Sequence, residues 1–125
     1  MLTIKTKLDK SKIHGIGVFA EEFIPKGKVV YQYLEGFDII YSTEQIEKMS
    51  MLTRKYIEHY AYYSSGEGGY VLCGDNGRFV NHSKTPNIQM YNRINTVALK
   101  DIQIGEEITE DYFYFDEHAA IKLNI

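Results

Sequence analysis

Two stretches of the chain repeat one pattern, and this repeat limits the folds that the sequence allows. They read AEEFIPKGKVV (Ala20–Val30) and ALKDIQIGEEI (Ala98–Ile108). In each, an Ala is followed four residues later by an Ile, and three residues after that by a Gly. Because glycine accepts positive φ, each stretch is typical of a strand, a polar turn closed by Gly27 or Gly105, and a second strand. The repeat therefore predicts a chain built from short strands.

One segment, STEQIEKMSMLTRKYIEHYAYY from Ser42 onward, has helical periodicity. Ser42 and Gln45 match a capping box, which favours a helix start. Apolar side chains then recur at three- and four-residue steps: Ile46, Met49, Leu52, Tyr56 and Tyr60. Strands are predicted after it at YVLC (Tyr70–Cys73), IQMYNR and INTVAL. We therefore predict a mainly β fold with one inserted helix (α+β), in a single domain over residues 1–125.

Charge and hydropathy exclude several classes of function. The 125 residues carry 14 Lys and Arg against 17 Asp and Glu, a formal net charge of -3, with both signs interspersed. Phosphate binding needs a concentrated basic surface, so direct nucleic-acid binding is not expected. No apolar run has the length of a membrane span, and the first residues do not resemble a secretory leader. These features predict a soluble intracellular protein.

The sulfur and aromatic content also constrain the chemistry. Cys73 is the only cysteine, so a single chain forms neither a disulfide framework nor a cysteine-rich zinc cluster, and we expect a buried, unreactive thiol. Eleven Tyr and six Phe accompany the absence of Trp. Tyrosine rings pack in cores and also line pockets through their hydroxyls. Both interpretations of the tyrosines stay open.

Three short motifs concentrate polar side chains. HGIG (His14–Gly17) is compatible with a tight turn and with a ligand-binding loop. GRFVNHSKTPN (Gly77–Asn87) gathers short polar side chains beside turn residues, as connecting loops do. GEEITEDY (Gly105–Tyr112) has four acids, typical of a solvated face, with no histidine beside them at ligand spacing, so no metal site is expected. His82 with Ser83 would suggest nucleophilic catalysis, but no third group orients them.

Taken in order, these motifs closely resemble the SET-domain family of protein lysine methyltransferases. HGxG stands near the start, Tyr33 in a second strand, Tyr70 before RFVNHSxxPN, and GEEIxxDY near the end, from about His14 to Tyr112. The resemblance implies a β-clip-like fold whose C-terminal segment threads beneath a loop near NHS as a pseudoknot, which few folds do. It also implies transfer of a methyl group from S-adenosylmethionine (SAM) to a lysine of a histone or another protein. The length is similar to that of a minimal SET core.

The same resemblance implies site residues. Tyr112 matches the family's catalytic tyrosine, in a reaction that must align a neutral lysine amine with a sulfonium methyl group. SAM is expected to lie against His14, Gly15, Ile16, Gly17, Tyr70, Asn81 and His82. The substrate lysine is expected in an aromatic channel of Tyr33, Glu110, Phe113 and Tyr114. Arg78 and Ser83 are expected to hold the loop in shape.

Three features depart from the family pattern. Many SET enzymes close the lysine channel with a zinc-bound cysteine segment, whereas FYFDEHAAIKLNI has no cysteine, so the aromatic tail or the second subunit of a homodimer would close it. Glu110 stands two residues before Tyr112, where the family usually has an apolar or aromatic side chain that helps set the number of methyl groups. The YLEG segment at Tyr33 is one residue longer than the usual tyrosine-x-glycine. The alternative function is a SET-like module that binds SAM or a peptide without turnover.

Overall fold

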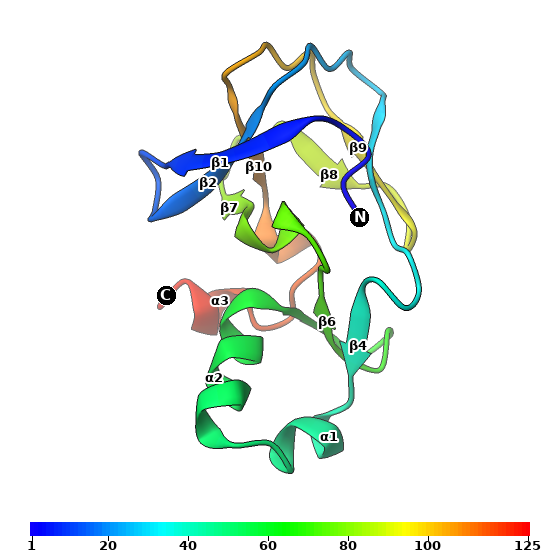
Figure 1. Ribbon diagram of the computed structural model, residues 1–125, viewed down its shortest axis with the longest axis vertical. Helices are drawn as coiled ribbons and strands as arrows, with labels where there is room; N and C mark the ends of the chain where they lie inside the picture. Colours follow the sequence, from blue (N-terminus) through cyan, green and yellow to red (C-terminus); the bar gives the residue numbers. More distant parts are fainter.

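Three small sheets form the framework of the molecule, which is described for residues 1–125 by a computed structural model (Figure 1). The first sheet has the order β1-β2-β10-β7, and its strands are β1 (Thr6–Lys10), β2 (Ile16–Ala20), β7 (Asn81–His82) and β10 (Glu107–Glu110). The second has the order β3-β9-β8, with β3 (Val29–Gln32), β8 (Ile88–Met90) and β9 (Asn95–Ala98). The third has the order β4-β6-β5, with β4 (Ile39–Tyr41), β5 (Tyr62–Ser64) and β6 (Gly69–Leu72). The predicted mainly β fold is confirmed.

The two repeated stretches pair with each other. Ile24 and Ile102 exchange backbone hydrogen bonds of 2.9 and 2.8 Å. The N–H of Gly27 donates to the carbonyl of Ala98, and the N–H of Gly105 donates to that of Ala20, both at 2.8 Å. Gly27 and Gly105 have φ of 88° and 89°, so both turns use the left-handed region that favours glycine. Because these hydrogen bonds are reciprocal, an approximate local two-fold axis relates the two stretches. Their pairing joins the first sheet to the second.

The main core lies between the first two sheets. Burial of apolar surface there is the largest favourable term that holds the sheets together. Its members come from both repeated stretches and from the segments that flank them: Leu2, Ile4, Val18, Ala20, Ile24, Val30, Val80, Ile88, Ala98, Ile102 and Ile108. A smaller core lies where α2 (Met51–Tyr60) covers the third sheet: Ile46, Ile57, Ala61 and Leu72. In Figure 1 this second core occupies the half of the molecule that contains β4, β6 and the two longer helices.

The predicted single helix is wrong in one respect, because two helices occupy the segment. The Ser42 and Gln45 capping box is present and starts α1 (Thr43–Glu47). Ser50 then caps a second helix, α2 (Met51–Tyr60), by accepting a hydrogen bond from the N–H of Thr53. The break rotates the apolar stripe, so Leu52 is 82% exposed and Ile57 takes the buried position. Serine competes for backbone hydrogen bonds, which is why it ends one helix and begins the next.

The C-terminal segment runs between elements that are distant in sequence. Strand β10 pairs with β2 on one edge and, in parallel, with the short β7 on the other. The chain then forms the 3-10 helix η2 (Tyr112–Tyr114) and reaches β5, where Glu117 N–H donates to the carbonyl of Tyr63. It ends in α3 (Ala119–Lys122), which lies beside α2 in Figure 1. None of the helices combines the length and apolar composition needed to cross a membrane.

Candidate active site

Two cavities meet at Tyr112. The larger has a volume of about 670 Å³, and residues from five separate segments line it. They are the loop before β2, the C-terminal end of α2, the segment from η1 (Asn76–Phe79) into β7, the Tyr112 ring and the segment from the last turn of α3 to Asn124. Among the expected SAM ligands it contains His14, Gly15, Ile16, Asn81 and His82. Segments separated by nearly the whole chain therefore form one concave surface.

Asn81 joins the two halves of this larger cavity. Its Nδ2 lies 3.0 Å from the carbonyl oxygen of His14 and 3.1 Å from that of Ile16. The same nitrogen lies 3.0 Å from Oε2 of Glu107. Only 9% of Asn81 is exposed. Since a buried amide needs partners, these contacts hold the HGIG loop against β7.

Gly17 makes room for another side chain of the protein, whereas its motif suggests contact with a ligand. A Cβ atom at this position would lie 2.5 Å from Oε2 of Glu107, so the carboxylate occupies the space that a side chain would need. That carboxylate accepts the Ser11 hydroxyl at 2.8 and 2.9 Å as well as the Asn81 amide. Glycine is therefore required for the approach of Glu107, and Glu107 is a site residue that the motif search missed.

Substituting Gly17→Ala should lower the free energy of unfolding by about 1–2 kcal/mol, because Glu107 must swing away from Ser11 and Asn81. Urea unfolding followed by circular dichroism measures this change. Gly66→Ala is the matched control, since the nearest atom to its Cβ would be a serine oxygen at 3.8 Å and its φ is ordinary. Equal effects of the two substitutions would contradict the role of Glu107.

Tyr112 is held by two hydrogen bonds. Its backbone N–H donates to Nδ1 of His82 at 3.1 Å, so that nitrogen carries no proton. Its hydroxyl donates to the carbonyl of Val80 at 2.5 Å. Burial, followed by the nearby carboxylates of Glu110 and Asp116, raises the pKa of Tyr112 well above its usual range. The phenol is therefore a neutral hydrogen-bond donor whose ring borders both cavities.

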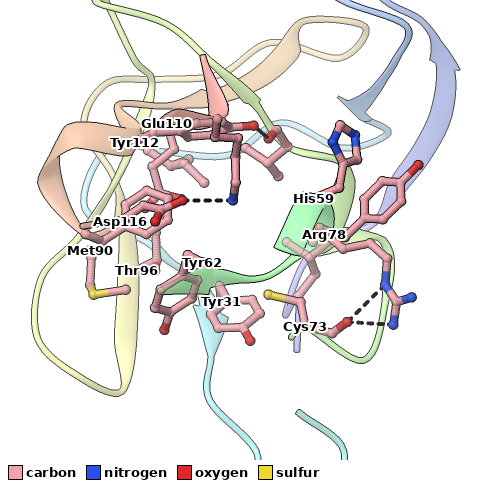
Figure 2. A pocket seen from close by; sticks show the side chains of 17 residues that line it. Tyr31, His59, Tyr62, Cys73, Arg78, Met90, Thr96, Glu110, Tyr112 and Asp116 are labelled. Atoms are coloured by element: carbon pink, nitrogen blue, oxygen red, sulfur yellow. Dashed lines mark hydrogen bonds and ion pairs between the residues drawn. The ribbon is translucent and has the colours of Figure 1, made fainter. Parts of the chain in front are cut away.

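The smaller cavity has a volume of about 70 Å³ and an aromatic lining (Figure 2). Tyr31, Tyr62, Tyr112 and Phe115 supply the rings, and Glu110 and Asp116 supply carboxylates. A single water needs about 10–15 Å³ of such space, so a narrow polar group of several atoms fits. Burial raises the pKa of Glu110 to about 8, and an opposing interaction with the backbone of Met90 is smaller.

Three buried polar atoms of the protein have no hydrogen-bond partner, and all three belong to residues that line this cavity: Tyr31 Oη, Glu110 Oε1 and Asp116 Oδ2. Native proteins leave few such atoms unpaired, and each one has an energetic penalty. Their gathering in one place favours a polar ligand. Acceptor oxygens together with aromatic faces suit a group that is cationic and donates N–H.

An ammonium group already lies at this place. Lys122 from α3 lines both cavities, and its Nζ lies 2.8 Å from Oδ2 of Asp116, although the pair is not aligned as a hydrogen bond. The same Nζ donates to the carbonyl of Ala61 at 2.5 Å and lies 5.7 Å from the centroid of the Tyr112 ring. The junction of the two cavities therefore accepts a primary ammonium.

Five of the expected site residues line neither cavity: Gly17 and four aromatic residues. Tyr33 follows the end of β3 and points its hydroxyl to the carbonyl of Asp38 at 3.4 Å, whereas Tyr31 lines the smaller cavity. Tyr70 packs against Tyr63 on the third sheet, with ring centroids 5.0 Å apart. The other two, Phe113 and Tyr114, have exposed fractions of 51% and 64%. Each of these placements corrects the prediction, because strand ends and sheet faces decided where the rings point.

Arg78 and Cys73 hold the loop before β7 together. The guanidinium of Arg78 donates to the carbonyl of Cys73 at 3.1 and 2.8 Å (Figure 2). It also donates to the hydroxyl of Tyr56 at 2.8 Å. Burial raises the pKa of the Cys73 thiol to about 11, so it is protonated at neutral pH. The expected loop-holding role of Arg78 and the unreactive thiol agree with this geometry.

Comparison with known proteins identifies the family. The family model of the SET domain matches residues 15–113, which is most of the chain. The chain belongs to the SET-domain family. It is 32% identical over 111 residues to the histone-lysine N-methyltransferase Set2 of Drosophila melanogaster, covering 80% of this chain and 5% of the fly protein. Against the histone-lysine N-methyltransferase ASHH3 of Arabidopsis thaliana, it is 30% identical over 129 residues, 86% of this chain and 32% of the plant protein.

Solved SET structures share the fold. A humanized mutant of the Chaetomium thermophilum Polycomb Repressive Complex 2 bound to the inhibitor GSK126 gives a TM-score of 0.63 at 28% identity, covering 90% of this chain and 15% of that one. The same complex in an autoinhibited conformation bound to S-adenosylmethionine gives 0.64 at 25% identity, with coverages of 97% and 17%. This SET domain therefore spans only a small part of the much longer proteins that it matches.

Proposed function

We propose that this SET domain transfers a methyl group from SAM to the ε-amine of a protein lysine, with residues 1–125 acting as one domain. The observation that carries the proposal is the meeting of two unlike cavities at the Tyr112 ring. One has the size of a cofactor site, and the other is narrow, aromatic and acidic. A transferase that joins a large donor to the tip of a side chain needs such a pair of spaces.

The larger cavity fits SAM in size and in charge. Its volume of about 670 Å³ falls within the range of small-molecule sites, roughly 300–1,000 Å³. At its Tyr112 end a cation already lies over an aromatic ring and against a carbonyl oxygen, which is the environment that a sulfonium also prefers. When bound, SAM supplies a sulfonium methyl group that is open to attack by an amine. The proposed ligands are the cavity residues His14, Gly15, Ile16, Asn81 and His82.

The chain's own residues would align the reactants. The Tyr112 phenol is held by Val80 and cannot ionise at neutral pH, so it acts by position and as a neutral donor. The smaller cavity would receive the lysine tip, with Tyr31 and Glu110 in place of the wall expected from Tyr33. Burial among aromatic rings lowers the pKa of an amine and excludes water that would solvate its charged form.

The substrate is proposed to be a basic protein segment, and a histone is the first class to test. Curated relatives such as the fly and plant proteins act as histone-lysine N-methyltransferases, as their names state. An acidic net charge of -3 does not repel a basic peptide. The exposed rings of Phe113 and Tyr114 are the candidate surface for a second copy of the chain, which light scattering at high concentration tests.

The proposed function is tested by incubating the purified protein with methyl-labelled SAM and a panel of histones and other lysine-rich proteins. Labelled methyl-lysine in at least one protein, identified by mass spectrometry, is the expected result. Calorimetric binding of SAM without any labelled product would support the alternative of a non-catalytic binding module. Neither binding nor label would refute the proposal.

Substituting Asn81→Ala should weaken SAM binding about tenfold or more, because the HGIG loop loses its attachment to β7. Isothermal titration calorimetry gives the dissociation constant. Asn92→Ala is the control, since its side chain only accepts two backbone N–H groups in the β8–β9 turn. An unchanged dissociation constant for Asn81→Ala would show that the cofactor pocket is elsewhere.

A further inference from the structure

Glu110 is a half-buried acid whose enclosed Oε1 atom has no partner. It lies at the end of β10, and its carboxyl group borders the smaller cavity together with Tyr112 (Figure 2). Its Oε1 is enclosed and receives no hydrogen bond, and none of the ion pairs in the protein includes this residue. An enclosed carboxyl oxygen without a hydrogen-bond partner destabilises the folded protein unless a ligand pairs with it.

Most of the other titratable groups that face the cavity are already paired or stay protonated at neutral pH. Asp116 accepts backbone N–H groups of Tyr63 and His118 with Oδ1 and has Lys122 beside Oδ2. Burial raises the pKa of three of the four phenols of the lining, Tyr31, Tyr62 and Tyr112, and of the Cys73 thiol, so they remain protonated at neutral pH. His59, Tyr60 and Arg78 complete the titratable lining. Glu110 is the acid with a free oxygen.

A lysine substrate must lose a proton before its amine can react in the smaller cavity. Its amine has an ordinary pKa near 10.4, so it arrives as an ammonium whose nitrogen lone pair is occupied by a proton. The nitrogen can form a bond to carbon only after that proton has left. Resting on the proposed function, we propose that the Glu110 carboxylate accepts this proton in the smaller cavity, and so acts as the general base of methyl transfer.

Every bond, proton and electron pair is accounted for in the proposed methyl transfer. The ammonium N–H bond breaks, the proton joins Glu110 Oε1, and a neutral amine and a neutral carboxylic acid result. The amine lone pair then forms the new N–C bond, while the methyl–sulfur bond of SAM breaks and its electrons stay on sulfur as a thioether. The product leaves as a methylated ammonium, and Glu110 returns its proton to solvent before the next turnover.

Geometry and proton affinity support Glu110 for this step over its neighbours. It lines the smaller cavity together with Tyr112 and Lys122, and the Lys122 ammonium, which pairs with Asp116, shows that this cavity accepts a primary ammonium. A base works best when its pKa lies close to the working pH, and burial brings that of Glu110 to about 8. Burial lowers the pKa of the substrate amine, so this pKa approaches that of Glu110.

Glu110→Gln tests the proposal because it keeps the shape of the side chain and removes the base. With the best substrate peptide, wild-type kcat/KM should rise tenfold per pH unit up to about pH 8 and then level off. The variant should be about 100-fold slower at pH 7.5, the scale of general-base catalysis. Its rate should keep rising toward pH 10, where the lysine loses its proton unaided, so the difference narrows at high pH.

Controls separate this role from a loss of structure and from failure of the proposed function. Glu106→Gln, an exposed neighbour whose amide oxygen can still accept the Gln103 N–H, should match the wild-type profile. Carbon-13 NMR titration should show one glutamate carboxyl in the wild type titrating near pH 8 and missing from Glu110→Gln, with SAM affinity unchanged by calorimetry.

Parallel pH profiles for Glu110→Gln and the wild type would overturn the role of Glu110 while leaving methyl transfer intact. No transfer by the wild type would instead overturn the proposed function, and the role of Glu110 with it. A peptide with aminoethylcysteine in place of lysine adds a readout on the substrate side, because its amine is more acidic. It should recover part of the lost rate in Glu110→Gln and change the wild-type rate little.

Discussion

Tyr112→Phe should reduce methyl transfer by about 10²–10³-fold, which is the effect of removing one preorganised hydrogen-bond donor from an active site. The phenylalanine ring retains the packing against His82 and Phe115, whose ring centroids lie 5.3 and 5.9 Å from that of Tyr112. Only the hydroxyl is lost, so the aromatic face that separates the two cavities remains. The expected change therefore comes from chemistry rather than from unfolding.

The lost hydroxyl has one partner, the carbonyl of Val80. Without it, that carbonyl loses this hydrogen-bond donor beside the cavities where the proposed methyl donor and acceptor meet. Single-turnover rates with methyl-labelled SAM measure the effect, and calorimetry should show SAM affinity within a few fold of the wild type. Tyr91→Phe, at a position that is 76% exposed, is the control for phenol removal. Full activity of Tyr112→Phe would remove Tyr112 from the mechanism.

Asp116→Asn should lower the free energy of unfolding by about 3 kcal/mol. Its side chain is 1% exposed and lies 2.8 Å from the Lys122 ammonium, which is itself only 15% exposed. Asparagine can still accept the N–H groups of Tyr63 and His118, but it leaves a buried positive charge without its partner. Breaking one side of a buried pair typically has a cost of about 3–5 kcal/mol.

A double substitution tests whether the loss of stability in Asp116→Asn comes from the unpaired charge of Lys122. Asp116→Asn with Lys122→Met removes both charges and keeps a similar volume, so it should recover most of the lost stability. Urea unfolding of the four proteins in the cycle gives the coupling energy. Asp9→Asn, in an exposed pair with Lys7, should change the free energy of unfolding by less than about 0.5 kcal/mol. Additive effects of the two buried substitutions would contradict the pairing.

Local signals predicted the parts of the fold that depend on neighbouring residues. The capping box at Ser42 and the two glycine turns at Gly27 and Gly105 form as predicted, since each depends on a few adjacent residues. The helix was predicted too long because the apolar spacing continues through Ser50, where a serine cap restarts the helix. Apolar periodicity reflects the spacing of side chains, and it does not reflect the competition of serine side chains for backbone hydrogen bonds.

The residues expected at the lysine channel coincide only in part with the smaller cavity. Tyr112 and Glu110 line this cavity, whereas Tyr33, expected at the channel, and Tyr70, expected beside SAM, line neither cavity. Tyr31 replaces Tyr33 because β3 ends at Gln32, and the chain turns away from the cavity after that residue. The residues that complete the site, Asp116 and Lys122, belong to no motif, so only their contacts with β5 and with the Tyr112 ring reveal them.

By itself, the sequence determined the family, the predominance of short strands, the two glycine turns and the segments that carry the site. These follow from local conformational preferences and from the order of short motifs along the chain. Only the tertiary structure decided that the repeated stretches pair with each other, that Glu107 fills the space beside Gly17, and that Lys122 lies over Tyr112. Such contacts join residues far apart in the chain. Their geometry depends on how the sheets pack, which no local pattern encodes.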